Sequence, residues 1–306
     1  MDLLANILIG IIVASTPLVF AAIGELVAEK SGVLNLGVEG MMIMGAIAGF
    51  ATVVSTGNHP LALLAAMTGG AVTALLFAVL TQTLLANQVA SGLALTMFGL
   101  GLSALWGQGY SGRPAGPFPR LAIPGLSDLP LIGKLIFGED YMVYLSLGAV
   151  AGVWWFLNWT RGGLTLRAVG ENHDAAHAIG LPVVRVRTLA LMFGGAMAGL
   201  GGAYLSLVQT PLWAENMTAG RGWIALALVV FSAWKPWRCL AGAYIFGGVT
   251  VVQLHAQALG VSIPAEYLSM LPYLATIAVL VMISRDAVAV HVNAPASLGK
   301  TFYAAS

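Results

Sequence analysis

The segment 188–214, TLALMFGGAMAGLGGAYLSLVQTPLWA, contains no Asp, Glu, Lys or Arg. Comparable uncharged stretches cover 3–24, 141–160, 239–265 and 267–284. A helix that crosses a bilayer needs about 20 predominantly apolar residues, and it satisfies its backbone hydrogen bonds within itself. These stretches therefore predict transmembrane helices.

The composition points to the same class of protein. Of the 306 residues, 59% are apolar and 8% are charged, and the mean hydropathy is +0.90. Soluble domains carry about 25% charged residues, so this composition excludes a soluble enzyme. The net charge of +1 offers no basic surface for nucleic acid, and we expect no such partner. The single cysteine, Cys239, excludes a disulfide framework and a cysteine zinc cluster.

We predict an all-α fold, a polytopic transmembrane helical bundle of roughly eight to ten spans forming a single domain over 1–306. The expected spans are 3–24, 38–56, 60–80, 91–109, 140–158, 188–208, 218–235, 239–258 and 266–284. The span 218–235 is the weakest, because Arg221 and Lys235 leave only a short apolar centre between them.

Basic residues set the expected orientation, because cytoplasmic loops carry an excess of Lys and Arg. With the loop 159–187 in the cytoplasm, alternation of the spans puts the tail 285–306 on the same side. The proline-rich loop 110–139 then lies outside. The basic residues expected inside are Lys30, Arg161, Arg167, Arg185, Arg187, Lys235, Arg238, Arg285 and Lys300. Those expected outside are Arg113, Arg120, Lys134 and Arg221.

The loop 159–187 contains the signals of a short helix over about 173–179. Asn172 is a favourable N-cap, Asp174 suits the positive first turn, and Gly180 favours termination. A helix this short is marginal alone in water. We therefore expect it to rest on another surface.

Small side chains indicate what that surface is. Ala175 and Ala176, beside Ile179, would let the helix press into a groove on a soluble partner. The alternative is an ordinary interfacial helix on the lipid headgroups. His173 and His177 have the spacing of a metal pair, but without a third ligand they predict no metal site.

A polar interruption over 31–40 breaks an otherwise apolar run. Broken helices are tolerated at membrane depth where they line a cavity, and Asn35 and Glu39 could contact a polar solute there. The alternative is a cytoplasmic turn, with Glu39 in the first turn of the next helix. Asn87 and Gln88 form a similar interruption, which is either a short cytoplasmic loop or the mouth of a pathway.

Four segments carry a family resemblance. They are EKSGVLNLGVEGMMIMG (29–45), NQVASGLAL (87–95), RAVGEN (167–172) with the later Ala175, Ala176 and Gly180, and GAMAGLGGAYLS (195–206). Together they resemble ABC-importer permeases of the nucleoside and simple-sugar type, which are relatives of the ribose and branched-chain amino acid permeases. The resemblance covers nearly the whole chain and implies a type II ABC-importer permease fold. His173 and His177 depart from it, since more varied polar residues are expected there.

The resemblance implies a transport subunit without catalytic residues. Such a permease pairs with a second homologous permease, a cytoplasmic ABC ATPase that binds ATP and Mg²⁺, and an extracellular or periplasmic substrate-binding protein. It implies a multi-pass protein, surrounded by lipid in the bacterial cytoplasmic (inner) membrane, that moves a nucleoside or related sugar-like solute inward by alternating access. This chain is expected to bind no cofactor. The residues implied to couple to the ATPase are Gly170, Glu171, Asn172, Ala175, Ala176, Ile179 and Gly180.

The alternative function is an ion-coupled secondary transporter of a small polar solute. It would need Asp, Glu or His deep in the bilayer, and the expected spans are almost bare of such groups. ATP hydrolysis by this chain is not expected. The nearest phosphate-loop pattern, 294–301, has no preceding strand.

Overall fold

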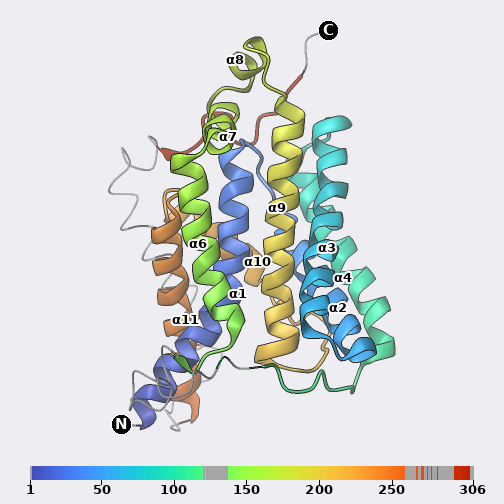
Figure 1. Cartoon of the computed structure of the whole chain (residues 1–306), viewed down its shortest axis with the longest axis vertical. Helices are drawn as coiled ribbons and strands as arrows, with labels where there is room; N and C mark the ends of the chain where they lie inside the picture. The colour runs from blue at the N-terminus through green and yellow to red at the C-terminus, as the bar shows by residue number, and fades with distance from the viewer. Residues whose placement is uncertain are drawn as a thin grey trace.

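Figure 1 shows the computed structural model of the chain, a bundle of helices. The structure describes residues 2–119, 121, 137–258, 267, 270, 271, 274, 277, 281 and 293–303. The helices are α1 (Asp2–Lys30), α2 (Val38–Thr56), α3 (His59–Ala78), α4 (Gln88–Gly107), α6 (Tyr141–Trp159), α7 (Arg161–Glu171), α8 (His173–Ala178), α9 (Val183–Tyr204), α10 (Arg221–Phe231) and α11 (Pro236–Ala258). Short π-helical turns, Val79–Thr83 and Leu205–Gln209, extend α3 and α9, and a 3-10 turn, Gln108–Tyr110, extends α4.

Within the described residues, seven helices are long and apolar enough to cross a membrane: α1, α2, α3, α4, α6, α9 and α11. They confirm the predicted all-α class. They also confirm the expected spans 3–24, 38–56, 60–80, 91–109, 140–158, 188–208 and 239–258, with boundaries shifted by up to six residues. The expected span 266–284 lies largely outside the described residues.

The expected span 218–235 is wrong. Its helix, α10, has 11 residues and is therefore about 16 Å long. That length is about half of the ~30 Å hydrocarbon core. The preceding segment, 210–220, consists of turns and extended backbone. The apolar residues between Arg221 and Lys235 therefore form a helix that is too short to cross the membrane.

Burial separates a central pair of helices from a rim. In the most apolar part of α2 and of α9, 83% of the residues are buried, against 28% in α4. The contacts of α9 are made at glycines: Gly199 meets Gly45 of α2, and Gly195 meets Gly70 of α3. A side chain at any of these positions would collide with the facing backbone. Small residues permit this close approach of helices in membranes.

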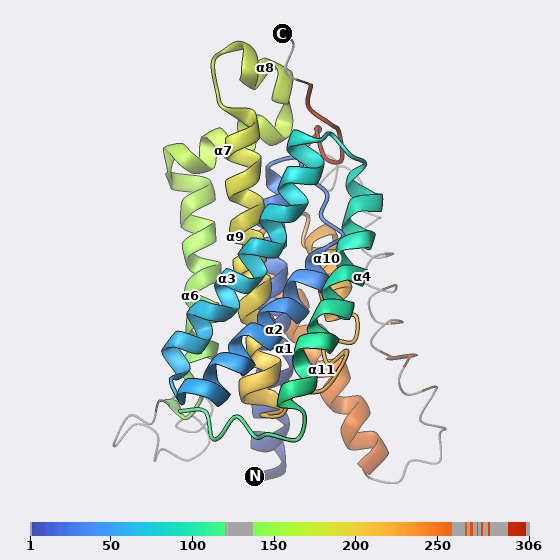
Figure 2. The ribbon, with the colours of Figure 1, turned by 90° about the vertical axis from the view of Figure 1, so that its right-hand side faces the viewer.

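Two short segments re-enter the bundle from opposite ends. After α1, the chain 31–37 turns back from the end that carries α7 and α8, and α2 starts inside the bundle (Figure 2). After α9, the chain 210–220 turns back from the other end, and α10 starts inside (Figure 2). The two helix starts meet, because Glu39 of α2 accepts hydrogen bonds from the backbone of α10. The predicted break over 31–40 is confirmed, and α10 supplies a second break that was not predicted.

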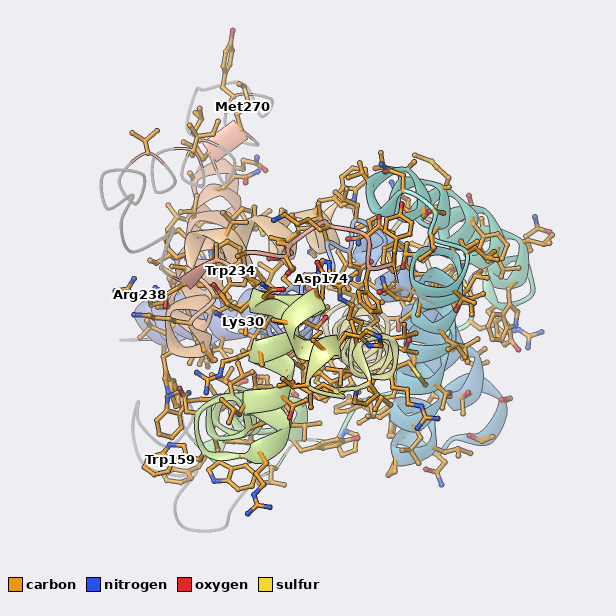
Figure 3. The ribbon with its side chains drawn as sticks, turned by 90° about the horizontal axis from the view of Figure 1, so that it is seen from above. Lys30, Trp159, Asp174, Trp234, Arg238 and Met270 are labelled. Carbon is orange, nitrogen blue, oxygen red and sulfur yellow. The ribbon has the colours of Figure 1, made fainter. Side chains whose placement is uncertain are left out.

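Basic residues gather at the end of the bundle that carries α7 and α8, which we call the α7–α8 end. Lys30 ends α1 there and Arg238 lies in the first turn of α11, as Figure 3 shows from above. The described part of the loop 110–139, with Arg113, runs along the opposite end (Figure 1). The described part of this loop and the segment 159–187 therefore lie at opposite ends of the bundle, and their placement outside and in the cytoplasm stays a prediction.

Arg221, one of the basic residues expected outside, does not lie at the outer end of a span. It begins α10 inside the bundle. Its Nη1 donates a hydrogen bond to the carbonyl of Met217 at 2.9 Å. Local hydrogen bonding of this kind lets a guanidinium lie away from the ends of the bundle.

Candidate functional site

The α7–α8 end contains the helix predicted over 173–179. α8 spans His173–Ala178, and the Oδ1 of Asn172 accepts a hydrogen bond from the backbone N–H of Ala175 at 3.0 Å. Gly180 follows with a φ of +86°, a left-handed conformation that ends helices. The predicted helix and its cap are confirmed. α8 lies beyond the ends of α3, α6 and α9 (Figure 1).

Ala175 and Ala176 of α8 lie on different sides of the helix. Ala176 is 3% exposed and packs with Val169 and Phe302 of its own chain. The prediction that Ala176 presses into a partner's groove is therefore wrong. Ala175 is exposed, and Ile179, four residues later on the same side, is 76% exposed. These two residues form the outer face of α8.

The remaining residues of the predicted coupling contact divide into two groups. Gly170 is buried, and a Cβ there would collide with the backbone carbonyl of Lys30, so its role is the close packing of α7 on the end of α1. Glu171, Asn172 and Gly180 are exposed. Only the second group is placed where a partner could reach it.

One fully buried arginine, Arg187, links three parts of this end. Its Nε donates to the carbonyl of Ser31 and its Nη1 to the carbonyl of Lys300, each at 3.2 Å. Its Nη2 lies 3.1 Å from the Nδ1 of His173. A guanidinium can serve several acceptors at once because it carries five N–H donors. Arg187 thus joins the α1–α2 connection, α8 and the C-terminal segment.

The C-terminal segment 293–303 completes the support of α8. The backbone N–H of Ser297 donates to the carbonyl of Gly170 at 2.9 Å. The ring of Phe302 lies against both histidine rings of α8, with centroid distances of 5.4 and 5.3 Å. These histidines therefore serve packing. Among the described residues, no group of three or more His, Cys, Asp or Glu could hold a metal ion.

The second cluster is the inner junction of α2 and α10. Glu39 is 2% exposed, and its two carboxylate oxygens accept hydrogen bonds from the backbone N–H groups of Gly220 at 2.8 Å and Gly222 at 2.6 Å. Glu39 also lies in the first turn of α2. The positive ends of two helix dipoles therefore converge on one carboxylate. This arrangement stabilises a charge that would be costly if it were unpaired at membrane depth.

The other predicted pathway residues bond within the chain. Asn35 is fully buried, and its Nδ2 donates to the Oε2 of Glu25 at 3.0 Å. Gln88 is 3% exposed and accepts a hydrogen bond from the backbone N–H of Leu34 at 2.8 Å. Asn87 is exposed and caps α4. The structure thus gathers Asn35 and Gln88 around the re-entrant segment, with Asn87 beside it. Contact of these residues with a solute stays a prediction.

Two carboxylates in α1 had no assigned role in the sequence analysis. Glu25 is 1% exposed and bonds to Asn35, and Glu29 is fully buried and accepts a hydrogen bond from the Nε1 of Trp234 at 2.6 Å. The expectation that the spans are almost bare of ionisable groups is therefore wrong for α1. The available signal was the i, i+4 spacing of these glutamates beside an apolar run, which puts both on one helix face.

Sequence comparison gives this architecture a family. The family described as the permease component of the branched-chain amino acid transport system matches residues 7–280. The chain belongs to this permease family. It is a multi-pass membrane protein and a transport component rather than an enzyme, which confirms the resemblance that the four segments indicated.

Three relatives of this permease match over nearly their whole length. A putative glucose ABC transporter permease of Haloferax volcanii is 41% identical over 302 residues, 92% of each chain. A guanosine ABC transporter permease of Bacillus subtilis is 33% identical over 293 residues, 91% of this chain and 92% of its own. A nucleoside ABC transporter permease of Lactococcus lactis is 32% identical over 299 residues, 92% of this chain and 93% of its own.

The histidine that contacts Arg187 gives this end of the permease a pH dependence. Burial and the neighbouring Arg187 guanidinium lower the pKa of His173, and Asp174 opposes that shift. The folded permease therefore favours the neutral ring, which can accept a hydrogen bond from Arg187. Above the unfolded pKa of about 6.5 both states are neutral, so His173 does not change stability there.

We expect acidification to destabilise the permease through His173. As the pH falls below about 6.5, the unfolded state binds the proton more readily, and stability is lost down to the folded pKa. The slope from one such group is at most about 1.4 kcal/mol per pH unit. Thermal unfolding of the wild type and of His173→Gln between about pH 5 and 8 checks this. The glutamine variant should have a smaller slope, and an equal slope would contradict the assignment.

Replacing Glu39 should loosen the junction of α2 and α10. In Glu39→Gln an amide N–H₂ faces a backbone N–H of α10, and loss of the charge-assisted hydrogen bond should cost about 1.5–3 kcal/mol. The measurement is the shift of the thermal unfolding midpoint in detergent. Glu215→Gln is the matched control, because it makes the same chemical change at an exposed position of the adjoining segment 210–220. Equal midpoints for the two variants would argue against the role given to Glu39.

Proposed function

We propose that this permease is the membrane subunit of an importer and that a separate ABC ATPase drives it through α8. The observation that carries the proposal is the outer face of α8, Ala175 and Ile179, exposed on a helix held rigidly from behind. A small apolar face on a short helix fits a groove on a soluble partner. The ATPase supplies the sites for ATP and Mg²⁺, and this chain holds neither.

The contacts behind α8 make it suitable for transmitting force. A helix of six residues would fray alone in water. Burial of Ala176, the Phe302 ring and the bonds of Arg187 fix α8 to the ends of α1 and α9. A displacement of the docked ATPase is therefore passed to the centre of the bundle, where it favours one of the two alternating-access states.

The solute of this importer is a nucleoside or a related sugar-like molecule. The names of three similar permeases support this class, since they refer to guanosine, nucleosides and glucose. An extracellular or periplasmic binding protein delivers the solute, and a second homologous permease completes the membrane assembly. The importer lies in a bacterial cytoplasmic membrane. Its α7–α8 end faces the cytoplasm, in keeping with the excess of basic residues there.

The solute route passes beside the junction of α2 and α10. This places it next to Asn35, Glu39 and Gln88, with Asn87 near the mouth at the start of α4. The hydroxyl of Thr218, just before α10, is fully buried and has no hydrogen-bond partner among the described residues. A buried polar group without a partner is costly, and a polar solute could supply the missing hydrogen bond.

Ala175→Arg should block ATPase docking. The long charged side chain would occupy the groove meant for the outer face of α8, so copurification of the ATPase should fall by at least about tenfold, or 1.4 kcal/mol. Ala296→Arg is the control, because it places the same side chain at an exposed position of the C-terminal segment. Unchanged copurification with Ala175→Arg would overturn the docking proposal, provided that the variant is folded.

Thr218→Val tests the solute route separately. The change preserves shape and removes only the hydroxyl, so uptake by the complete importer should show a KM raised by about twofold to tenfold with no loss of thermal stability. Thr73→Val is the control, because the Thr73 hydroxyl already bonds within α3. An unchanged KM for Thr218→Val would move the route away from this segment without affecting the docking proposal.

A further inference from the structure

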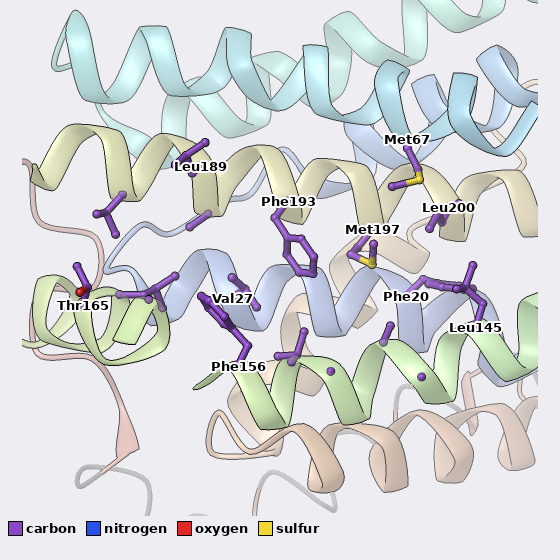
Figure 4. A pocket seen from close by; sticks show the side chains of 18 residues that line it. Phe20, Val27, Met67, Leu145, Phe156, Thr165, Leu189, Phe193, Met197 and Leu200 are labelled. Carbon is purple, nitrogen blue, oxygen red and sulfur yellow. The ribbon is translucent and has the colours of Figure 1, made fainter. Parts of the chain in front are cut away.

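A deep apolar groove lies between α6 and α9, with α1 as its floor (Figure 4). Its volume is about 770 Å³, within the range of ligand pockets. Phe20 and Val27 of α1, Leu145 and Phe156 of α6, and Leu189 and Phe193 of α9 line it. Among the residues that line it, Thr165 of α7 carries the single polar side chain. The groove is separate from both the outer face of α8 and the junction of α2 and α10.

Glycines on α6 give the groove its depth. Gly148 and Gly152 line it, and a Cβ at either position would meet no atom within 4 Å. These glycines therefore differ from Gly195 and Gly199 of α9, where facing backbone occupies the space beside the glycine. Along α6 that space stays open and forms part of the groove.

The groove has the length and position of one membrane leaflet. Its wall on α9 runs from Val186 to Leu200, which is about 21 Å at the helical rise of 1.5 Å per residue. One leaflet of a bilayer, with its headgroup region included, is about 20–22 Å thick. Thr165 marks the end nearest α7, and Leu145 and Leu200 mark the deep end (Figure 4).

Two exposed arginines are next in the chain to residues that line the end nearest α7. Arg161 begins α7 and adjoins Gly162, which lines the groove. Arg185 lies one turn before Leu189 on α9. Cationic side chains at the end of an apolar channel are complementary to a lipid, whose acyl chain is apolar and whose phosphate is anionic. The positive charges of Arg161 and Arg185 therefore favour a phospholipid over an uncharged apolar ligand in this groove.

We propose that this groove binds one phospholipid of the leaflet on the α7–α8 side. One acyl chain lies between α6 and α9, and Arg161 and Arg185 hold the phosphate. The proposal depends on neither the docking of an ATPase nor the identity of the solute.

Native mass spectrometry of the full-length permease, purified in detergent, tests the acyl-chain site. Gly152→Leu fills the groove and also replaces a helix-interior glycine by a better helix former. The wild type should retain one phosphatidylglycerol molecule that Gly152→Leu retains at least tenfold less. Gly101→Leu on α4 is the matched control, because Gly101 is likewise exposed with open space around it. It should retain the lipid like the wild type.

Several outcomes would overturn the proposal. Equal retention by Gly152→Leu and the wild type would do so, as would an equal loss in Gly101→Leu. So would an unchanged lipid count accompanied by a changed oligomeric state, since the groove would then hold a second copy of the chain. Gly148→Leu repeats the test from one turn away, and thermal unfolding verifies that each variant is folded.

The phosphate contact has its own measurement. The wild type should retain phosphatidylglycerol over diacylglycerol, which has the acyl chains but no phosphate. The double variant Arg161→Gln, Arg185→Gln should reduce that preference by about tenfold while still retaining diacylglycerol. A preference that is unchanged in the double variant would show that these arginines do not hold the phosphate, and it would overturn that part of the proposal.

Discussion

The carboxylate of Glu39 joins the starts of two helices, α2 and the half-length α10, inside the bundle, and the central architecture depends on that contact. Each helix start leaves backbone N–H groups without intrahelical partners, and lipid offers none. Glu39 satisfies two such groups of α10 while lying in the first turn of α2. The re-entrant segment 31–37 is stabilised in the same way, because Asn35 and Gln88 accept hydrogen bonds from its backbone N–H groups. The polar residues of the re-entrant segment therefore support the broken backbone before any solute is considered.

Most of the spans could be predicted because their cause is local: a helix that crosses lipid must be long and nearly uncharged. The structure departs from the predicted spans where residues distant in the sequence form hydrogen bonds that stabilise a buried charge or a broken helix. α1 continues to Lys30 because Asn35 and Trp234 bond to its glutamates. α10 stops short of a span because the segment before it leads the chain to Glu39. A hydropathy profile of one sequence does not show which distant residues bond to the α1 glutamates or to the start of α10.

The α7–α8 end shows the same division between local and distant causes. The start and stop of α8 follow from Asn172 and Gly180, which act on their own neighbours. The direction in which α8 faces follows from the C-terminal segment, which contacts it across 124 residues of sequence. That contact covers Ala176 and leaves Ala175 exposed, and neither composition nor the helical period predicts which of the two alanines is covered. The glycines of α6 and α9 likewise look alike in the sequence. Those of α9 contact facing backbone, whereas Gly148 and Gly152 of α6 leave open space.

The support of α8 by residues 293–303 has a consequence for how the protein is made. Helices of a membrane protein emerge from the ribosome in chain order, so α7 and α8 are made long before Ser297 and Phe302 have been translated. Until then α8 lacks the hydrogen bond and the ring contacts that hold it in place. Translation of these late residues is therefore a condition for the geometry of α8, and for any assembly that depends on that geometry.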